Sequence, residues 1–117
     1  MRRVVRSQGT IVISTPFFHR ADHEADRWRF TAAGLTHLAR GANLDVERLQ
    51  PQGAALACAA SILRYAASTQ PRWRRRFWTL VAAPMLRRLL ARDAAWARRE
   101  PTLATFTTGY LLTARKP

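Results

Sequence analysis

Asp26-Arg27-Trp28-Arg29-Phe30-Thr31 is the stretch that joins a strand pattern to a helix start, and the rest of the chain is interpreted outward from it. It brings a carboxylate, two guanidiniums and two large aromatic rings together, and Thr31 stands where a helix N-cap is expected. In α/β proteins, loops after a strand carry the binding groups. Two interpretations stay open. Asp26 and Arg29 either contact a ligand at a pocket rim, or form a structural pair with Trp28 and Phe30 as core filler.

The segment before this stretch predicts a strand and then a polar loop. Residues 10–15 are β-branched and uncharged, which favours a strand buried on both faces, and Pro16 ends it. The loop 19–30 holds two histidines and three carboxylates, but their spacing matches no specific metal signature, so no metal site is predicted. Histidine titrates near neutral pH and is able to act as a base. The predicted substrate-binding residues are His19, His23, Asp26 and Arg29.

The segment after it predicts a helix, a strand and a helical region. Residues 31–42 form an amphipathic helix pattern, and residues 43–50 alternate like an edge strand before a turn at 51–53. Residues 54–68 are apolar nearly all round, typical of a buried or membrane-surface helix. Residues 71–99 predict a basic helix, either a lid packed on its own domain or an interfacial helix on anionic lipid. Residues 104–114 predict the last strand.

Composition limits the function without deciding it. The chain has 117 residues and a formal net charge of +13, which first suggests a nucleic-acid partner. However, Lys116 is its only lysine and arginine is abundant throughout, so the charge also fits a compositional bias, and nucleic acid ranks last among the partners. Cys58 is the only cysteine, which excludes a disulfide within the chain. The longest uncharged run is too short to span a bilayer, and a cytoplasmic location is expected.

The order of these segments resembles the carboxyl-terminal half of a class I S-adenosylmethionine-dependent methyltransferase of the type 11 group. The resemblance rests on the turn at Gly9, on the strand end Ser14-Thr15-Pro16-Phe17, on the D-x-W-R-F-T segment and on the terminal Ala114-Arg115-Lys116-Pro117. It implies an α/β fold with a partial Rossmann-like, mixed sheet of three strands and a helical insertion before the last strand. The strands would be the family's fifth, sixth and seventh, with the seventh antiparallel between the other two. The expected parts of this single partial domain are 10–53, 54–100 and 104–114.

The resemblance also shows what the chain lacks. The family binds S-adenosyl-L-methionine through a glycine-rich turn and an acidic residue upstream of these strands, and neither occurs here. The chain alone is therefore expected to be inactive, with unknown catalytic residues and a small-molecule or lipid-linked methyl acceptor. Strand 10–15 would leave an open edge for pairing with another chain. The alternative function is a non-catalytic module that binds anionic membrane, and less readily nucleic acid, through residues 71–99. That would place the protein peripherally at the inner membrane surface.

Overall fold

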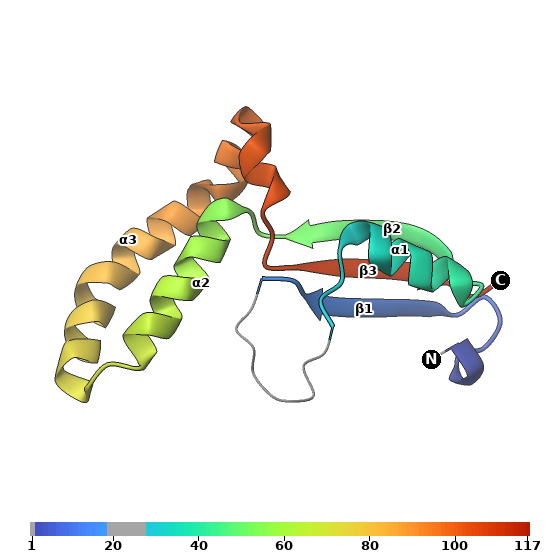
Figure 1. The fold of residues 1–117 in the computed structure, drawn as a ribbon, viewed down its shortest axis with the longest axis horizontal. Helices are drawn as coiled ribbons and strands as arrows, with labels where there is room; N and C mark the ends of the chain where they lie inside the picture. The colour runs from blue at the N-terminus through green and yellow to red at the C-terminus, as the bar shows by residue number, and fades with distance from the viewer. Residues whose placement is uncertain (1, 19–27) are drawn as a thin grey trace. The chain divides into compact units, whose positions relative to one another are not determined.

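The structure is a computed structural model that describes residues 2–18 and 28–117 (Figure 1). Three predicted site residues, His19, His23 and Asp26, lie outside the described residues. The described chain divides into two compact units. The sheet unit comprises residues 1–52 and 108–117, and the helical unit comprises residues 53–107.

In its described residues, the sheet unit holds one α-helix and three strands. A 3-10 turn η1 (Arg2–Val4) precedes β1 (Thr10–Pro16), which is followed by α1 (Ala32–Gly41), β2 (Asp45–Gln52) and, after the helical unit, β3 (Gly109–Arg115). Thr31 caps α1 as predicted, because its hydroxyl oxygen accepts a hydrogen bond from the Gly34 amide at 3.1 Å.

The three strands form one antiparallel sheet in the order β1-β3-β2. The predicted position of the last strand, antiparallel between the other two, is confirmed. The prediction of a mixed sheet is wrong, because no two hydrogen-bonded strands in the described residues are parallel. The reason lies in the connection. The chain leaves β2 at Gln52 and returns beside it at Thr108, whose amide donates to the Gln52 carbonyl at 3.0 Å. A strand that starts where its neighbour ends must run in the opposite direction.

The core of the sheet unit lies on the side covered by α1. Its buried residues come from all three strands or the loops beside them and from α1: Ile11, Leu35, Ala39, Leu44, Leu112 and Ala114. The prediction that residues 10–15 are buried on both faces is wrong, since the Val12 side chain is 62% exposed. Successive side chains of a strand point to opposite faces, so Ile11 and Ile13 pack into this core while Val12 points away from it.

Two strand ends differ from the sequence prediction. β2 continues through Pro51 and Gln52, where a turn is predicted, because Pro51 lies on an edge strand that tolerates a missing amide donor. β3 begins at Gly109 rather than at residue 104, since Pro101 starts a 3-10 turn, η2 (Pro101–Thr105). A register shift between Val46 and Arg48 leaves Glu47 free to pair with Arg115 at 2.7 Å.

The helical unit consists of η2 and two helices, α2 (Ala55–Ser68) and α3 (Arg72–Arg99). Asp93 on α3 supplies the N-cap that α2 lacks locally. Its carboxylate oxygens accept hydrogen bonds from the Ala54 amide at 2.7 Å and the Leu56 amide at 3.0 Å. Cys58 and Ala60 are buried near the start of α2, whereas residues 61–66 are exposed. Burial of the whole 54–68 helix is therefore not observed.

Candidate functional site

The candidate site of the sheet unit is the edge where β1 and β2 end and β3 begins. Both strands run antiparallel to β3, so their carboxyl ends meet at one edge, where Pro16 and Gln52 flank Gly109 in register. Residues 28–31 lead into α1 at this same edge, where Figure 1 shows the start of α1 and the arrowhead of β1. Binding groups of open α/β sheets gather at such an edge. We call residues 14–18, 28–31, 50–52 and 108–110 the carboxyl edge.

Backbone hydrogen bonds fix the carboxyl edge. The Thr108 carbonyl accepts from the Phe17 amide at 2.9 Å and from the Phe18 amide at 3.2 Å. The Phe17 ring meets the Tyr110 ring edge to face, with centroids 5.9 Å apart. The edge is therefore a rigid base on which side chains are held in place.

The predicted residues that the structure describes take different positions at this edge. Trp28 is 73% exposed, Arg29 is half-buried, and Phe30 packs against the core of the sheet unit. Phe30 is thus core filler, whereas the same expectation for Trp28 is wrong. Because His19, His23 and Asp26 lie outside the described residues, convergence of the four predicted substrate-binding residues stays a prediction.

Thr15 is a site residue that sequence reasoning missed. Its hydroxyl oxygen is buried and has no hydrogen-bond partner in the described part of the chain. A buried polar group without a partner costs free energy, and such groups in native proteins often mark a binding position. The sequence signal is a hydroxyl near the carboxyl end of an uncharged strand, which Thr15 shares with the neighbouring Ser14.

The buried ionisable groups of the helical unit have a structural role. Asp93 is engaged as the cap of α2, so its carboxylate is not available as an acid or base for a ligand. Burial raises the pKa of the Cys58 thiol, and the nearby Asp93 charge raises it further. A protonated, buried thiol is a poor nucleophile. Among the described residues, no cluster of histidine, cysteine and carboxylate side chains is able to hold a metal ion.

The glycines do not form a cradle for S-adenosyl-L-methionine. A Cβ at Gly109 would lie 2.4 Å from the Thr15 carbonyl oxygen, and one at Gly9 would lie 2.6 Å from a Val5 methyl carbon. Both glycines therefore serve close packing within the sheet unit. Gly53 has a φ of 70° in the chain after β2. The residues present do not fit the cofactor that the resemblance implies.

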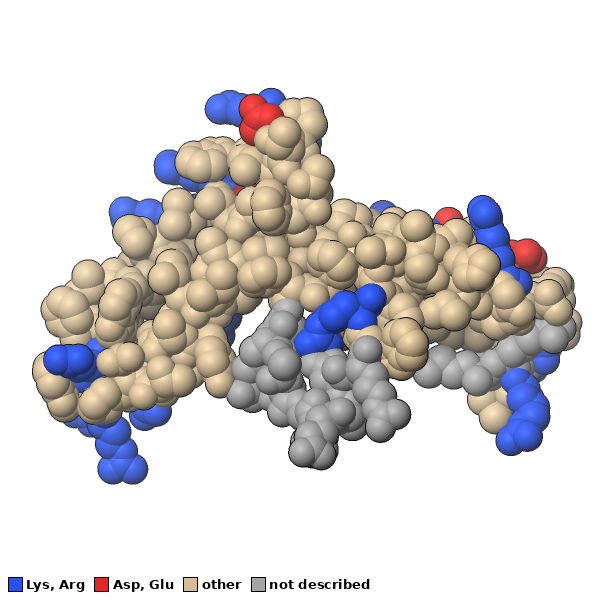
Figure 2. Space-filling view, viewed as in Figure 1, with Lys and Arg blue, Asp and Glu red and all other residues tan. Residues whose placement is uncertain are grey.

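The helical unit carries a second candidate surface, on the exposed side of α3. Trp73, Phe77, Leu80, Val81 and Met85 recur at helical spacing, and all five are between 56% and 76% exposed. We call these five residues the α3 stripe. In the face shown in Figure 2, arginine side chains project around the helical unit, with uncharged surface between them. No helix in the described residues is long and apolar enough to cross a membrane.

Comparison with protein-family models, with curated protein sequences and with solved structures finds no match for this chain. The resemblance to type 11 methyltransferases therefore stays a prediction.

Proposed function

We propose that this chain is the substrate-side half of an S-adenosylmethionine-dependent methyltransferase, and that residues outside it supply the cofactor-binding half. The observation that carries the proposal is the sheet order, with β3 antiparallel between β1 and β2. This is the arrangement that the resemblance implies for the family's fifth, seventh and sixth strands. The position of residues 28–31 at the carboxyl edge supports it further.

In this function the chain orients the methyl acceptor. Methyl transfer depends chiefly on holding a nucleophile in line with the methyl group to be transferred. Arg29 is half-buried, and a guanidinium is suited to an anionic group of the acceptor. The Thr15 hydroxyl, at the same carboxyl edge, is a further group able to form a hydrogen bond. His19, His23 and Asp26 are further proposed contacts. The acceptor is a small molecule or a lipid-linked molecule, and we propose a cytoplasmic protein that acts at or near the inner membrane surface.

The first experiment identifies the missing half. The nucleotides upstream of Met1 are read in all three frames for an acidic-x-Gly-x-Gly turn that follows a strand pattern. If the turn is in frame, the extended protein is produced and its binding of radiolabelled S-adenosyl-L-methionine is measured by photocrosslinking. We expect the extended protein to crosslink the cofactor and the 117-residue chain to show no methyl transfer above blank. Methyl transfer by the 117-residue chain alone would contradict the proposal, as would the absence of the turn from every frame and from every co-purifying protein.

The second experiment tests Arg29 in the extended protein. Arg29→Ala is expected to weaken acceptor binding about tenfold or more while cofactor crosslinking is unchanged, because a charge-assisted hydrogen bond to the acceptor is lost. Arg40→Ala is the matched control, since Arg40 is an exposed arginine in the last turn of α1. Equal acceptor affinity in the two variants would remove Arg29 from the site.

The alternative function, a non-catalytic membrane-binding module, is favoured by a different observation, the exposure of the α3 stripe. A lid helix would bury that stripe, whereas a membrane-surface helix leaves it open.

A further inference from the structure

We propose that the helical unit docks on the surface of an anionic phospholipid bilayer, with the α3 stripe entering the headgroup region and the surrounding arginines contacting lipid phosphates. The proposal does not depend on methyl transfer, because it concerns the helical unit alone. It rests on the position of the stripe, on the distribution of charge and on the chemistry that the two require together.

Much of the α3 stripe lies on the side of α3 opposite its buried residues. The buried residues of α3 are Leu86 and Asp93, which are seven positions apart and therefore share a face. At 100° per residue, Trp73, Phe77 and Leu80 lie on the opposite side of the helix from these two residues. Packing within the unit therefore buries two residues of α3 and leaves the large apolar side chains of the stripe exposed, although Trp73 and Phe77 also line a hollow with Leu63 of α2.

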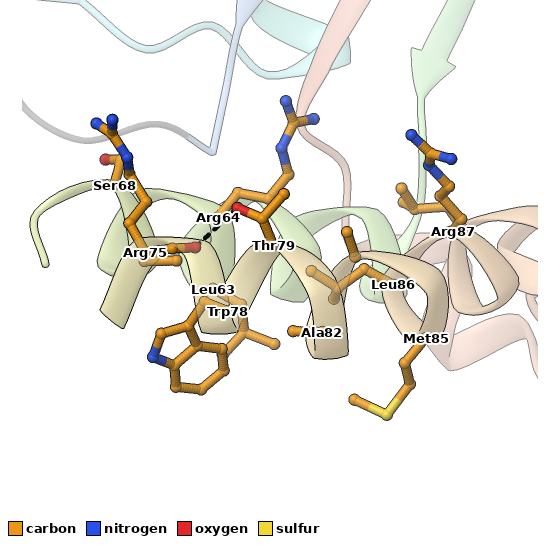
Figure 3. A pocket seen from close by; sticks show the side chains of 13 residues that line it. Leu63, Arg64, Ser68, Arg75, Trp78, Thr79, Ala82, Met85, Leu86 and Arg87 are labelled. Carbon is orange, nitrogen blue, oxygen red and sulfur yellow. Dashed lines mark hydrogen bonds between the residues drawn. The ribbon is translucent and has the colours of Figure 1, made fainter. Parts of the chain in front are cut away.

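The neighbouring helix extends the apolar surface. Leu63, Ala66 and Ala67 of α2 line a hollow together with Trp73 and Phe77. A second hollow of about 530 Å³ lies along the two helices (Figure 3). In Figure 3 the Trp78 indole and the Met85 thioether point to one side of the helix pair, while the guanidiniums of Arg64, Arg75 and Arg87 reach to the other. Around this hollow the apolar groups and these three guanidiniums point to opposite sides, whereas the Arg74 guanidinium lies over the Trp73 ring, 4.9 Å from its centroid. The surface therefore holds apolar and cationic groups close together, as helices in a membrane interface do.

The charge of this region has one sign. Between Arg48 and Arg92 the sequence contains no aspartate or glutamate, while eight arginines occur between positions 64 and 92. Several of them, such as Arg74 and Arg76, directly flank stripe residues, so their aliphatic stems are able to cover apolar surface while the guanidiniums reach phosphate. Charge complementarity therefore requires an anionic partner.

A bilayer fits both properties of this surface. Nucleic acid offers phosphates, and its bases stack on aromatic rings, but it has no apolar layer for Leu80, Val81 and Met85. An anionic bilayer presents phosphates above an apolar interior, and indole rings such as that of Trp73 favour the boundary between them.

The experiment measures flotation of the 117-residue protein with two kinds of vesicle, pure phosphatidylcholine and phosphatidylcholine containing about a third phosphatidylglycerol. We expect at least about tenfold stronger binding to the anionic vesicles, reduced but not abolished by salt, because the apolar part of the interaction is not screened. Equal binding to both vesicles, or to neither, would overturn the proposal.

Matched variants test each part of the surface. Trp73→Ala combined with Phe77→Ala is expected to lower vesicle binding about tenfold, while Trp96→Ala, which removes an exposed indole of α3 outside the stripe, leaves it unchanged. Arg74→Gln with Arg76→Gln is expected to weaken binding to anionic vesicles, and Arg3→Gln with Arg6→Gln controls for the same loss of charge elsewhere. All these side chains are exposed, so circular dichroism should show unchanged helix content.

Three outcomes would contradict the proposal. If each control lowers binding as much as its partner variant, net charge rather than this surface is responsible. If the protein binds duplex or single-stranded DNA with a steep salt dependence but no vesicles, the partner is nucleic acid. If Trp73→Ala with Phe77→Ala abolishes self-association of a protein that never floats with vesicles, the stripe is covered by a second copy. None of these outcomes bears on methyl transfer by an extended protein.

Discussion

Single residues of this chain differ in how far their role could be read from sequence. Thr31 could be predicted as a helix cap because its partner, Gly34, lies three positions away. Asp93 could not be predicted as a cap, since it reaches amides 37 and 39 positions earlier in the chain. Thr15 was missed for a related reason, because its burial depends on the packing of the whole sheet unit. Contacts between residues that are close in the sequence can be predicted from it, whereas the partners of long-range contacts cannot.

At this scale we predict that Asp93→Ala destabilises the helical unit by about 1–3 kcal/mol, because it leaves two amides at the start of α2 without an acceptor. Asp45→Ala, which removes an exposed carboxylate from β2, should change stability by less than about 0.5 kcal/mol. The unfolding midpoints of the two variants in urea are compared by circular dichroism at about 222 nm, where helices give a strong signal. Equal midpoints for the two variants would show that the Asp93 cap contributes little.

Elements were predicted well from periodicity, and their ends less well. The helix and strand patterns located α1, β1, β2, α2 and α3 within a few residues of their observed bounds. Errors arose at Pro51 and at residues 104–108, where a proline was compatible with an edge strand and β-forming residues belonged to a 3-10 turn and its exit. The prediction that both faces of β1 are buried was also wrong, because the sequence of a strand does not show how many faces of its sheet are covered.

The pairing of β1 with β3 gives a prediction about glycine. Gly109→Ala would place a Cβ 2.4 Å from the Thr15 carbonyl oxygen, so the strands must shift apart, at an expected cost of about 1–3 kcal/mol. Gly41→Ala is the matched control, because nothing lies within 4 Å of its Cβ at the end of α1. That change should be neutral or stabilise the protein by up to about 1 kcal/mol. The melting temperatures of the two variants test this prediction. A Gly109→Ala protein with the melting temperature of the wild type would show that the two strands do not approach this closely.

For the whole molecule, the open edge of the sheet is the property with the widest effect. β1 pairs with β3 on one side only, within the described residues, and its Val12 side chain is exposed. An unprotected edge strand invites pairing with another chain. In the proposed methyltransferase, the family's fourth strand would pair with this edge. The fold class could therefore be anticipated, but the sequence could not show whether the chain or a partner closes this edge.

We predict that Val12→Lys reduces self-association of the protein, because lysine on an edge strand opposes strand pairing. Val4→Lys adds the same charge at an exposed position outside the strands and should behave like the wild type. Sedimentation velocity at increasing protein concentration, at about 0.15 M salt to screen the net charge, measures the difference. A wild-type protein that stays monomeric at every concentration, or an equal effect of the two lysines, would argue against pairing through β1.

The hydrogen bond between Thr108 and Gln52 has a consequence for how such a chain can change over evolution. β2 and β3 are adjacent antiparallel strands, so residues 53–107 occupy the position of a hairpin loop. The chain leaves the sheet at Gln52 and returns to it at the neighbouring Thr108. The register of β2 and β3 is set by the pairing of these two strands, outside residues 53–107. Residues 53–107 are therefore free to lengthen, shorten or be exchanged for another sequence while the sheet keeps its pairing. A lineage is able to acquire, lose or exchange a helical unit at this position without changing the sheet.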